Sequence, residues 1–407
     1  MRKLLDKIDL DALRGLGTSL RGGVTCSISP QFTFGTENLV RELVFVDGIV
    51  WIARLGLFYE HPAIISSQVV TMRYVKKLTT IPIPEVYHYD TDENNPVGCQ
   101  YILMEAVSGC AAADSPHGVL LNLPNDKIDK VCAQLADIIL QLSRLEFPEI
   151  GSLQQAENGD VYIGNSYPIY KRLDTLPKFS STADYFKAIV FAKHSKRQTI
   201  NNMEWLARSE FSYSLRTCIA SNFITCERKL FPLTHPDFHA RNILFDDDYN
   251  ITAVLDWNRA STAPWEVFCN VPGGWYLYPA HEIERIDRVD AMQRVDVMRR
   301  LRERFIVALK AAEAKEVVSH PKDIRLSEIF EDPNTRKALA FSVHYLGYDK
   351  ELFEWAFGEA GPLKLDNYRD ALFANTKFKG YVWDSLSIRT EYSGGKGSRD
   401  IDSRCGC

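Results

Sequence analysis

Residues 233–257 contain polar side chains whose types and spacing suit phosphoryl transfer. The segment LTHPDFHARNILFDDDYNITAVLDW places His235, Asp237 and Asn242 in an H-x-D-x-x-x-x-N pattern, and Asp256 follows fourteen residues after Asn242. Transfer of a phosphoryl group from ATP needs one carboxylate to orient the acceptor hydroxyl. It also needs oxygen ligands to hold magnesium against the phosphates. Asp237 suits the first role, and Asn242 with Asp256 suits the second.

Two short apolar runs explain why these residues stand so far apart in the sequence. Residues 243–245 and 251–255 flank the polar stretch 246–250, which is typical of a β-hairpin. Because a hairpin brings its ends together, Asn242 and Asp256 are predicted to lie beside one cation. The alternative is a surface hairpin with an acidic turn and a structural histidine, since chance matches to such a motif are common.

Composition indicates a soluble globular protein large enough for two lobes. The chain has 407 residues, of which 45% are hydrophobic and 25% charged. Its formal net charge of −5 gives no electrostatic reason to expect nucleic acid or an anionic membrane as partner. No apolar run approaches the ~20 residues that a membrane-spanning helix needs.

The cysteines and the N-terminus predict a cytoplasmic protein with reduced thiols. The nine cysteines are scattered, and only Cys405 and Cys407 form a close pair. That pair is similar to the prenylated ends of small GTPases, but a disordered tail is favoured over lipidation. The first residues interrupt their apolar positions with Asp and Arg, which predicts a short amphipathic helix rather than a signal peptide.

The first quarter of the chain is predicted to be rich in strands, with one helix. Residues 39–46 and 49–54 are apolar runs joined by Asp47-Gly48, which predicts a hairpin with a type I′ turn. Residues 66–78 carry apolar side chains at helical spacing, and residues 101–104 are typical of a buried strand.

From about residue 125 onward the pattern becomes helical. An apolar stripe predicts a helix over 128–145, and the hairpin at 243–255 contains the only clear strands of this half. Further helices are predicted within 182–230, 285–316 and 335–358.

A small β-rich lobe followed by a helical lobe with one catalytic hairpin resembles the architecture of kinase-like phosphotransferases. The sequence resembles the aminoglycoside phosphotransferase (choline kinase-like) superfamily over roughly residues 20–380, and most of all the fungal proteins in it. The matching segments are W-I-A-R-L at 51–55, I-P-I-P-E-V at 81–86, I-L-M-E-A-V-S-G at 102–109, I-G-S-L at 150–153, H-P-D-F-H-A-R-N-I-L at 235–244 and V-L-D-W at 254–257.

The resemblance implies an α+β, protein kinase-like fold with two lobes. Its parts are an N-terminal helical segment, a nucleotide-binding N-lobe, a catalytic and substrate-binding C-lobe and a disordered tail, at residues 1–23, 24–107, 108–390 and 391–407.

The resemblance also implies a nucleotide site in the N-lobe. Arg54 stands where the superfamily usually has a phosphate-binding lysine, although a strand-edge Arg paired with a surface carboxylate is the alternative. The helix glutamate that normally holds that cation is matched best by Gln68, a departure that replaces an ion pair with a neutral hydrogen bond. Glu60 or Glu42 could instead be the partner.

Two further segments complete the implied nucleotide site. The turn containing Gly35 and Asn38 lies where kinases place a flap over the phosphates, though an ordinary turn would look similar. Met104 is expected at the back of the adenine slot. The Glu105 carbonyl and the Val107 amide would then face the base.

In the catalytic loop the neighbours of Asp237 have less certain roles. His235 is expected to support the loop rather than act as a base. His239 could supply positive charge near the transferred phosphate or be structural. Arg241 could reach phosphate or substrate, or could pair with Asp246 or Asp248.

The sequence therefore predicts an ATP- and Mg²⁺-dependent kinase of a small-molecule hydroxyl group. The acceptor could be a secondary metabolite, an amino alcohol or a sugar, and both GTP as donor and the oligomeric state remain open. A catalytically weak or inactive binding module is the alternative, favoured by Gln68 and Arg54. A protein kinase is disfavoured because no Ala-Pro-Glu segment follows Asp256.

Aromatic and polar residues after Asp256 could line the site of a flat substrate, but such residues more often belong to the core. They are Arg259, Trp265, Glu266, Trp275, Tyr276 and Tyr278.

Overall fold

The computed structural model of the chain describes residues 7–35, 37–111, 123–167, 175–197, 213, 215–217, 229–269, 289–315 and 325–331. The chain forms two compact units, residues 1–182 with 228–337 and residues 183–227 with 338–407. In the second unit the described residues are most of α5 (Thr182–Arg197) and four positions between 213 and 217. The helices predicted at 335–358 and the tail at 391–407 lie outside the described residues, and everything below concerns the first unit.

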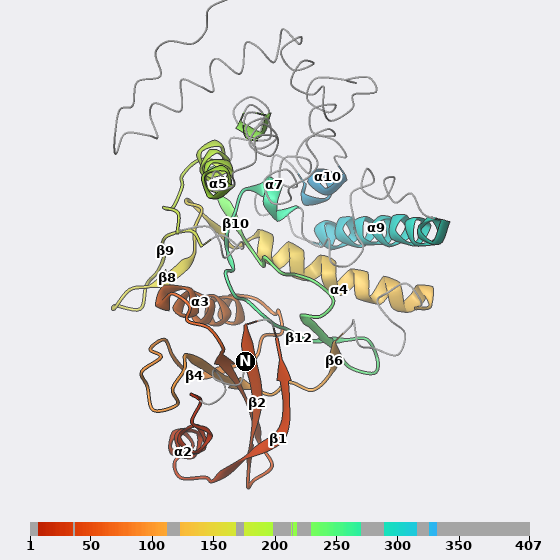
Figure 1. Cartoon of the computed structure of the whole chain (residues 1–407). Coiled ribbons are helices and arrows are strands. Elements are labelled where there is room, and N and C mark those ends of the chain that lie inside the picture. The colour runs from red at the N-terminus through yellow and green to blue at the C-terminus, as the bar shows by residue number, and fades with distance from the viewer. Residues whose placement is uncertain are drawn as a thin grey trace, which may run out of the picture. The chain divides into compact units, whose positions relative to one another are not determined.

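The N-terminal part of this unit is a five-stranded antiparallel sheet (Figure 1). Its spatial order is β1-β2-β3-β5-β4. The strands are β1 (Cys26–Phe34), β2 (Asn38–Phe45), β3 (Val50–Gly56), β4 (Val86–Asp90) and β5 (Tyr101–Glu105). Successive residues of β5 face opposite sides of the sheet: Leu103 joins the core beneath α2 (Leu10–Leu20), whereas Ile102 joins the core beneath α3 (Pro62–Leu78).

The predicted β2–β3 hairpin is confirmed, but its turn is not type I′. That turn needs positive φ at both central residues. Gly48 has a φ of 84°, whereas Asp47 is not among the left-handed residues. The Gly48 amide donates to the Phe45 carbonyl at 2.9 Å, and the Asp47 carboxylate accepts from the Ile49 amide at 3.2 Å. The connection is therefore longer, with a single left-handed glycine.

Helix α3 begins four residues before its predicted start at Ser66. Pro62 occupies the first turn, where its missing amide hydrogen costs nothing, and the His61 ring accepts from the Ala63 amide at 3.2 Å. The first turn adds Ile64 and Ile65 to the buried face. The loop between β3 and α3 is consequently short, at residues 57–61.

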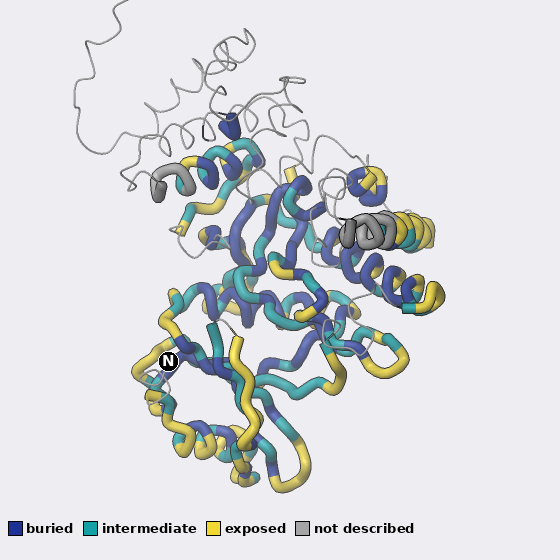
Figure 2. Tube along the Cα trace, turned by 45° about the vertical axis from the view of Figure 1, so that its right-hand side comes forward, coloured by how far each residue is buried: buried dark blue, intermediate teal, exposed yellow. Residues whose placement is uncertain are grey.

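The helical part of the unit packs around one continuous core. Helices α4 (Asn125–Ser143) and α9 (Val289–Lys315) lie side by side and bury facing apolar residues (Figures 1 and 2). The same core continues into α3 and into α10 (Leu326–Glu331). The helix predicted over 128–145 is thus confirmed, and the one predicted over 285–316 is confirmed over the described residues 289–315. No helix in the described part of the chain is both long and apolar enough to span a membrane.

The second half also contains short strands, so the expectation that its only strands are those of one hairpin is wrong. β10 (Phe231–Thr234) lies between β13 (Ser261–Thr262) and β7 (Glu146–Phe147), and β8 (Leu153–Gln155) pairs with β9 (Val161–Ile163). β6 (Cys110–Ala111) adds a strand to the predicted hairpin. Strands of two to four residues are too short to show an alternating pattern.

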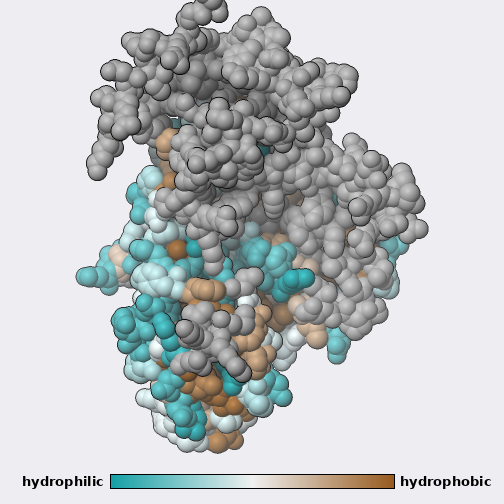
Figure 3. Space-filling model, viewed as in Figure 1, coloured by the Kyte–Doolittle hydropathy of each residue, from teal (hydrophilic) through white to brown (hydrophobic). Residues whose placement is uncertain are grey.

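The α+β fold class, with a β-rich N-terminal part and a helical part, is confirmed. Its surface is mixed: Figure 3 shows hydrophobic residues interspersed with hydrophilic ones over the sheet end of the viewed face. Exposed aromatic side chains of β1 include Phe32 and Phe34. Single exposed apolar residues of this kind are normal for a globular protein.

Candidate active site

The predicted hairpin exists and brings its two ends together. It consists of β11 (Ile243–Phe245) and β12 (Ile251–Val254), with Ile243 opposite Val254. Beyond the strands the ladder continues, because the Leu255 amide donates to the Asn242 carbonyl at 2.7 Å. Asn242 and Asp256 therefore become neighbours in space, as the sequence predicts.

The Asn242 side chain links the hairpin to Asp237. Its amide nitrogen donates to the Asp237 carbonyl at 2.9 Å and to the Asp237 Oδ2 at 3.1 Å. This arrangement orients the amide so that its nitrogen is used by Asp237. The amide oxygen remains for another partner, since it accepts no hydrogen bond within the described residues.

His235 is fully buried and links the catalytic loop to the end of the hairpin. Its Nδ1 accepts from the Asp237 amide at 3.3 Å, so Nε2 carries the proton and donates to the Leu255 carbonyl at 2.9 Å. The ring lies edge-on to Trp257, with centroids 4.6 Å apart. Burial lowers the pKa of His235 and keeps the ring neutral. With both nitrogens engaged by backbone, the geometry supports a structural role.

His239 forms the direct partner of Asp237. Its Nε2 lies 3.2 Å from Asp237 Oδ1, and its Nδ1 accepts from the Arg241 amide at 3.1 Å. The hydrogen bond between the two side chains lowers the pKa of Asp237 and raises the pKa of His239. Asp237 is consequently ionised at neutral pH, and the protonated form of His239 is favoured. Arg241 is exposed and forms no ion pair with a described residue.

Arg54 pairs with Asp256 and Asn38 rather than with the partners predicted for it. Its Nη2 lies 2.8 Å from Asp256 Oδ1. The Asn38 amide, oriented with its oxygen toward the guanidinium, accepts from Nε and Nη2 at 2.9 Å each. The expectation of Gln68, Glu60 or Glu42 as partner is therefore wrong, because the partner comes from the far end of the hairpin.

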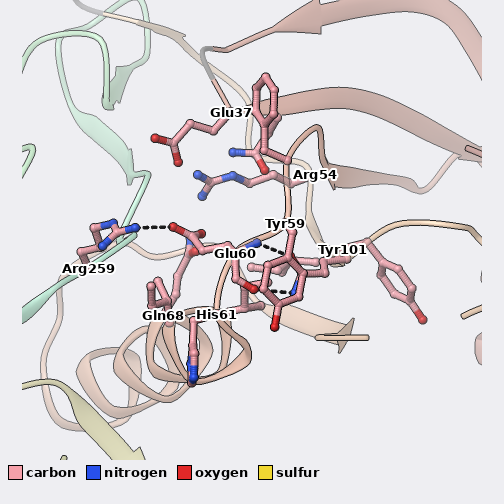
Figure 4. A pocket seen from close by; sticks show the side chains of 15 residues that line it. Glu37, Arg54, Tyr59, Glu60, His61, Gln68, Tyr101 and Arg259 are labelled. Atoms are coloured by element: carbon pink, nitrogen blue, oxygen red, sulfur yellow. Dashed lines mark hydrogen bonds and ion pairs between the residues drawn. The ribbon is translucent and has the colours of Figure 1, made fainter. Parts of the chain in front are cut away.

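A cavity of about 490 Å³ lies beside Arg54 (Figure 4). The start of β2, β3, the β3–α3 loop, α3 and the start of β5 contribute to its walls, which include Asn38, Arg54 and Gln68. Gln68 is only 4% exposed and shares the cavity with Arg54 without a hydrogen bond between them. Figure 4 shows Glu37, Arg54 and Glu60 directed into one space, with Arg259 entering from the hairpin side.

The other predicted nucleotide residues lie outside this cavity. The Gly35 amide donates to the Asn38 carbonyl at 2.9 Å, which closes a tight turn between β1 and β2. Met104, near the end of β5, packs against the core. The Glu105 carboxylate accepts from the Glu85 amide at 3.0 Å, and no described residue bonds to the Val107 amide. Their roles toward adenine remain predictions.

The oxygen donors of Asn242 and Asp256 fit a hard divalent cation. Asp256 Oδ1 is buried and receives no well-directed hydrogen bond, although Arg54 Nη2 lies within ion-pair distance. The residue also has a left-handed backbone with φ of 59°, a conformation that costs about 1–3 kcal/mol and tends to persist at functional sites. The described residues contain no cluster of three or more His, Cys, Asp or Glu side chains suited to a metal. Such a pair would bind magnesium only together with phosphate oxygens and water.

The contacts that join the hairpin to the sheet were not predicted, although Glu60 and Arg259 were named for other roles. Glu60 pairs with Arg259, and Glu37 accepts a hydrogen bond from Asn258. These partners are separated by 199 and 221 positions, so no local pattern links them. The one local signal for Asn258 was its place directly after Asp256-Trp257. Of the aromatic and polar residues suggested for a substrate, Trp265 and Glu266 are buried, and residues 275, 276 and 278 lie outside the described residues.

Comparisons with known proteins give a family match and several similar chains. A profile of the phosphotransferase enzyme family matches residues 31–267. A subtelomeric hrmA-associated cluster protein of Aspergillus fumigatus is 35% identical over 137 residues, which cover 33% of this chain but only 26% of that protein. Clavilactone A biosynthesis cluster protein Y of Ampulloclitocybe clavipes is 25% identical, with coverage of 59% and 62%.

Among solved structures, a similar fold occurs in a thermostable mutant of aminoglycoside phosphotransferase APH(4)-Ia in ternary complex with AMP-PNP and hygromycin B. The identity is 16% and the TM-score 0.47, with coverage of 95% of this chain and 99% of that chain.

Proposed function

The chain belongs to the phosphotransferase enzyme family, and from this premise we propose that it transfers the γ-phosphoryl group of ATP, with magnesium, to a hydroxyl group of a small molecule. One observation carries the proposal. The hairpin brings Asp256 next to Asn242 in space, and the Asn242 amide in turn holds Asp237. An acceptor-orienting carboxylate thus stands next to a pair of cation ligands.

Asp237 is proposed to orient the acceptor hydroxyl and to receive its proton as the new phosphate ester bond forms. Because the transition state of phosphoryl transfer is loose, a strong base is unnecessary, and a carboxylate with a lowered pKa is adequate. His239 is proposed to add positive charge beside the transferred group, since Asp237 favours its protonated form. His235 would hold the catalytic loop through the Asp237 amide and the Leu255 carbonyl.

The nucleotide is proposed to lie between the sheet and the hairpin. Arg54 would clamp phosphate oxygens with its planar fork. Asn242 and Asp256 would hold magnesium, which when bound neutralises charge on the phosphates. Met104, the Glu105 carbonyl and the Val107 amide would receive adenine, and the turn at Gly35 would cover the phosphates. Asn38 would act indirectly, by holding the Arg54 guanidinium.

A second candidate is a kinase-like binding module with little or no turnover. The observation that favours it is the contact between Arg54 and Asp256, which occupies the proposed phosphate clamp and a proposed metal ligand with each other. Phosphates and magnesium would have to separate this pair before either group could serve catalysis.

Thermal unfolding with ATP, GTP, ADP and magnesium, singly and combined, tests nucleotide binding. A ligand that binds only the folded state stabilises it by about 2.7 kcal/mol at a hundredfold excess over its dissociation constant. We expect a rise in the unfolding midpoint that needs both nucleotide and magnesium, and that Asp256→Asn loses the magnesium-dependent part. Asp247→Asn, in the exposed hairpin turn, is the matched control. No rise with any nucleotide would contradict the proposal, and comparison of ATP with GTP identifies the donor.

Turnover separates the two candidates. Release of ADP is measured with a panel of hydroxylated small molecules as acceptors. Binding of Mg·ATP together with acceptor-dependent ADP release supports the enzyme. Binding without ADP release for any acceptor supports the binding module.

A further inference from the structure

Glu60 and Arg259 form an ion pair between the β3–α3 loop and the segment that follows the hairpin. Arg259 Nη2 lies 2.8 Å from Glu60 Oε1, and the two side chains are only 12% and 19% exposed. Figure 4 shows this contact at the edge of the cavity that contains Arg54. A pair so shielded from water is costly to break, because removal of one partner leaves the other buried and uncompensated.

The backbone on the Glu60 side is fixed by a buried amide. Gln100 is only 3% exposed and spans the loop: its Oε1 accepts from the Glu60 amide at 2.8 Å, and its Nε2 donates to the Glu60 carbonyl at 2.7 Å. The same Nε2 donates to the Thr91 carbonyl at 2.7 Å. Glu60 therefore presents its carboxylate from a rigid position in the β3–α3 loop.

The other side of the contact is held in an unusual conformation. Arg259 has a left-handed backbone with φ of 60°, and Asp256 has one with φ of 59°. Asn258, between them, donates to Glu37 at 3.2 Å and approaches Glu60 at 3.4 Å. Two strained residues within four positions persist only when their surroundings over-determine them. The contacts with Glu37 and Glu60 supply that constraint.

Arg54 lacks the helix carboxylate that would ordinarily fix it. Gln68 makes no hydrogen bond to it, and Asp256 and Asn38 hold the guanidinium instead. The orientation of Arg54 thus depends on where Asp256 stands. The position of Asp256 depends in turn on the segment that Glu60 and Glu37 fasten.

We propose that Glu60 and Arg259 are positioning residues for phosphoryl transfer. Their ion pair fastens the Asp256 segment to the β3–α3 loop and so aligns Asp256 and Arg54 with the nucleotide phosphates. This inference rests on the proposed function. In this proposal the Glu60–Arg259 pair fixes the orientation of Arg54, which Gln68 does not do.

Calorimetric titration of the full chain with Mg·AMP-PNP, a non-hydrolysable ATP analogue, tests the proposal. The variants are Glu60→Gln, Arg259→Gln and the double variant, with Arg259→Lys as the conservative one. The control is Asp47→Asn, which breaks a different ion pair, that of Arg21 at the end of α2 with Asp47 in the β2–β3 turn, 2.8 Å apart. Urea unfolding without nucleotide reports folding separately from affinity.

A positioning role and a simple charge effect predict opposite changes in nucleotide affinity for Glu60→Gln. Loss of a negative charge near the phosphates would by itself tighten binding of an anion, whereas loss of the positioning pair weakens it. We expect each single variant to lose about tenfold in affinity, within the range typical of coupling between sites. The double variant should lose no more than either single one, because both remove the same pair. Arg259→Lys should retain more affinity than Arg259→Gln, and Asp47→Asn should match the parent.

The outcomes separate the two hypotheses. A parent protein that does not bind Mg·AMP-PNP overturns the proposed function and this inference with it. A parent that binds while Glu60→Gln binds equally well, or more tightly, overturns only the positioning role. Losses that add in the double variant would likewise show that Glu60 and Arg259 do not act as one unit.

Discussion

Asp237 combines a lowered pKa with an orientation set by its neighbours. The Asn242 amide bonds to one carboxylate oxygen at 3.1 Å, and His239 lies 3.2 Å from the other. The buried His235 accepts from the Asp237 amide, which fixes the backbone beneath the carboxylate. The side chain itself is about half exposed, as a group that must reach an acceptor has to be.

Replacement of Asp237 should therefore separate turnover from nucleotide binding. We expect Asp237→Asn to lower the rate of acceptor-dependent ADP release by at least about a hundredfold, the usual contribution of a positioned acid or base. Affinity for Mg·ATP should stay close to that of the parent, because Asn242 and Asp256 are intact. Asp247→Asn is the control for a lost surface carboxylate. Retained turnover in Asp237→Asn would assign the proton acceptor to another residue.

The His239–Asp237 contact should make stability depend on pH. The folded-state pKa of His239 is raised above its usual 6.5, so its stabilisation is complete below that value and is lost as pH rises through the raised pKa. The pKa of Asp237 is lowered from 3.8, so its share is present above that value and disappears only as pH falls through the lowered pKa. The pair is thus strongest in the mildly acid range.

The matching variant is His239→Gln, studied by urea unfolding. We expect it to lower the free energy of unfolding by less than about 1 kcal/mol near pH 5.5, because the pair is partly exposed. The loss should shrink as pH rises toward 9, because the stabilisation disappears as His239 loses its proton. An Asp237→Asn background should remove most of this pH dependence. An equal loss at both pH values would contradict the assignment.

Residue-scale geometry was predictable only where sequence spacing controls it. The hairpin brings Asn242 to Asp256 because two antiparallel strands joined by one turn place the residues at their open ends side by side. The partner of Arg54 was not predictable, because Asp256 lies 202 positions away and reaches β3 only through the packing of the whole unit. Buried pairs between distant segments leave no signal in either segment alone.

At the scale of elements, helix α2 shows how the sheet limits its neighbours. Gly15 and Gly17 lie in the same helix, but only Gly17 faces the sheet. A Cβ on Gly17 would stand 2.6 Å from Leu43 Cδ2 and 3.4 Å from Cys26 Sγ, whereas a Cβ on Gly15 would meet nothing within 4 Å. Gly17 therefore permits the close approach of the helix, and Gly15 serves no such purpose.

The two glycines give a matched pair of predictions with opposite signs. Gly15→Ala should raise the free energy of unfolding by about 0.5–1 kcal/mol, because alanine loses less backbone entropy in a helix. Gly17→Ala should lower it by about 1–3 kcal/mol, because the core beneath α2 must shift to admit a methyl group. Urea unfolding of both variants measures the difference. Equal effects would mean that α2 does not pack on the sheet as described.

Long elements were predictable and short ones were not. The apolar stripe of α4 repeats over several turns, so it survives errors at single positions. The strands β6, β7 and β13 have two residues each and depend on partners from other parts of the chain. The start of α3 at Pro62 had a local signal, a proline in the first turn after a polar residue. A search by apolar spacing alone places that start too late.

At the scale of the whole first unit, one core extends across the predicted lobe boundary between residues 107 and 108. Nine residues of α3 are buried, and most of the apolar ones share a core with α4 and the hairpin. Polar contacts cross the same boundary. The Thr80 amide donates to Gln141 at 2.8 Å, the Val254 amide to the Pro82 carbonyl at 2.8 Å, and Gln154 to the Ala63 carbonyl at 3.0 Å.

A fragment that ends at residue 111 should therefore fail to fold cooperatively, even though it contains the complete five-stranded sheet. Its α3 would expose the apolar face that α4 and the hairpin cover, and three backbone partners would be lost with the contacts above. We expect circular dichroism to show a shallow urea transition for the fragment, against a steep one for the full chain. A steep transition in the fragment would show that the sheet and α3 form an independent domain. The contacts between α3 and the hairpin would then position the site without stabilising the sheet.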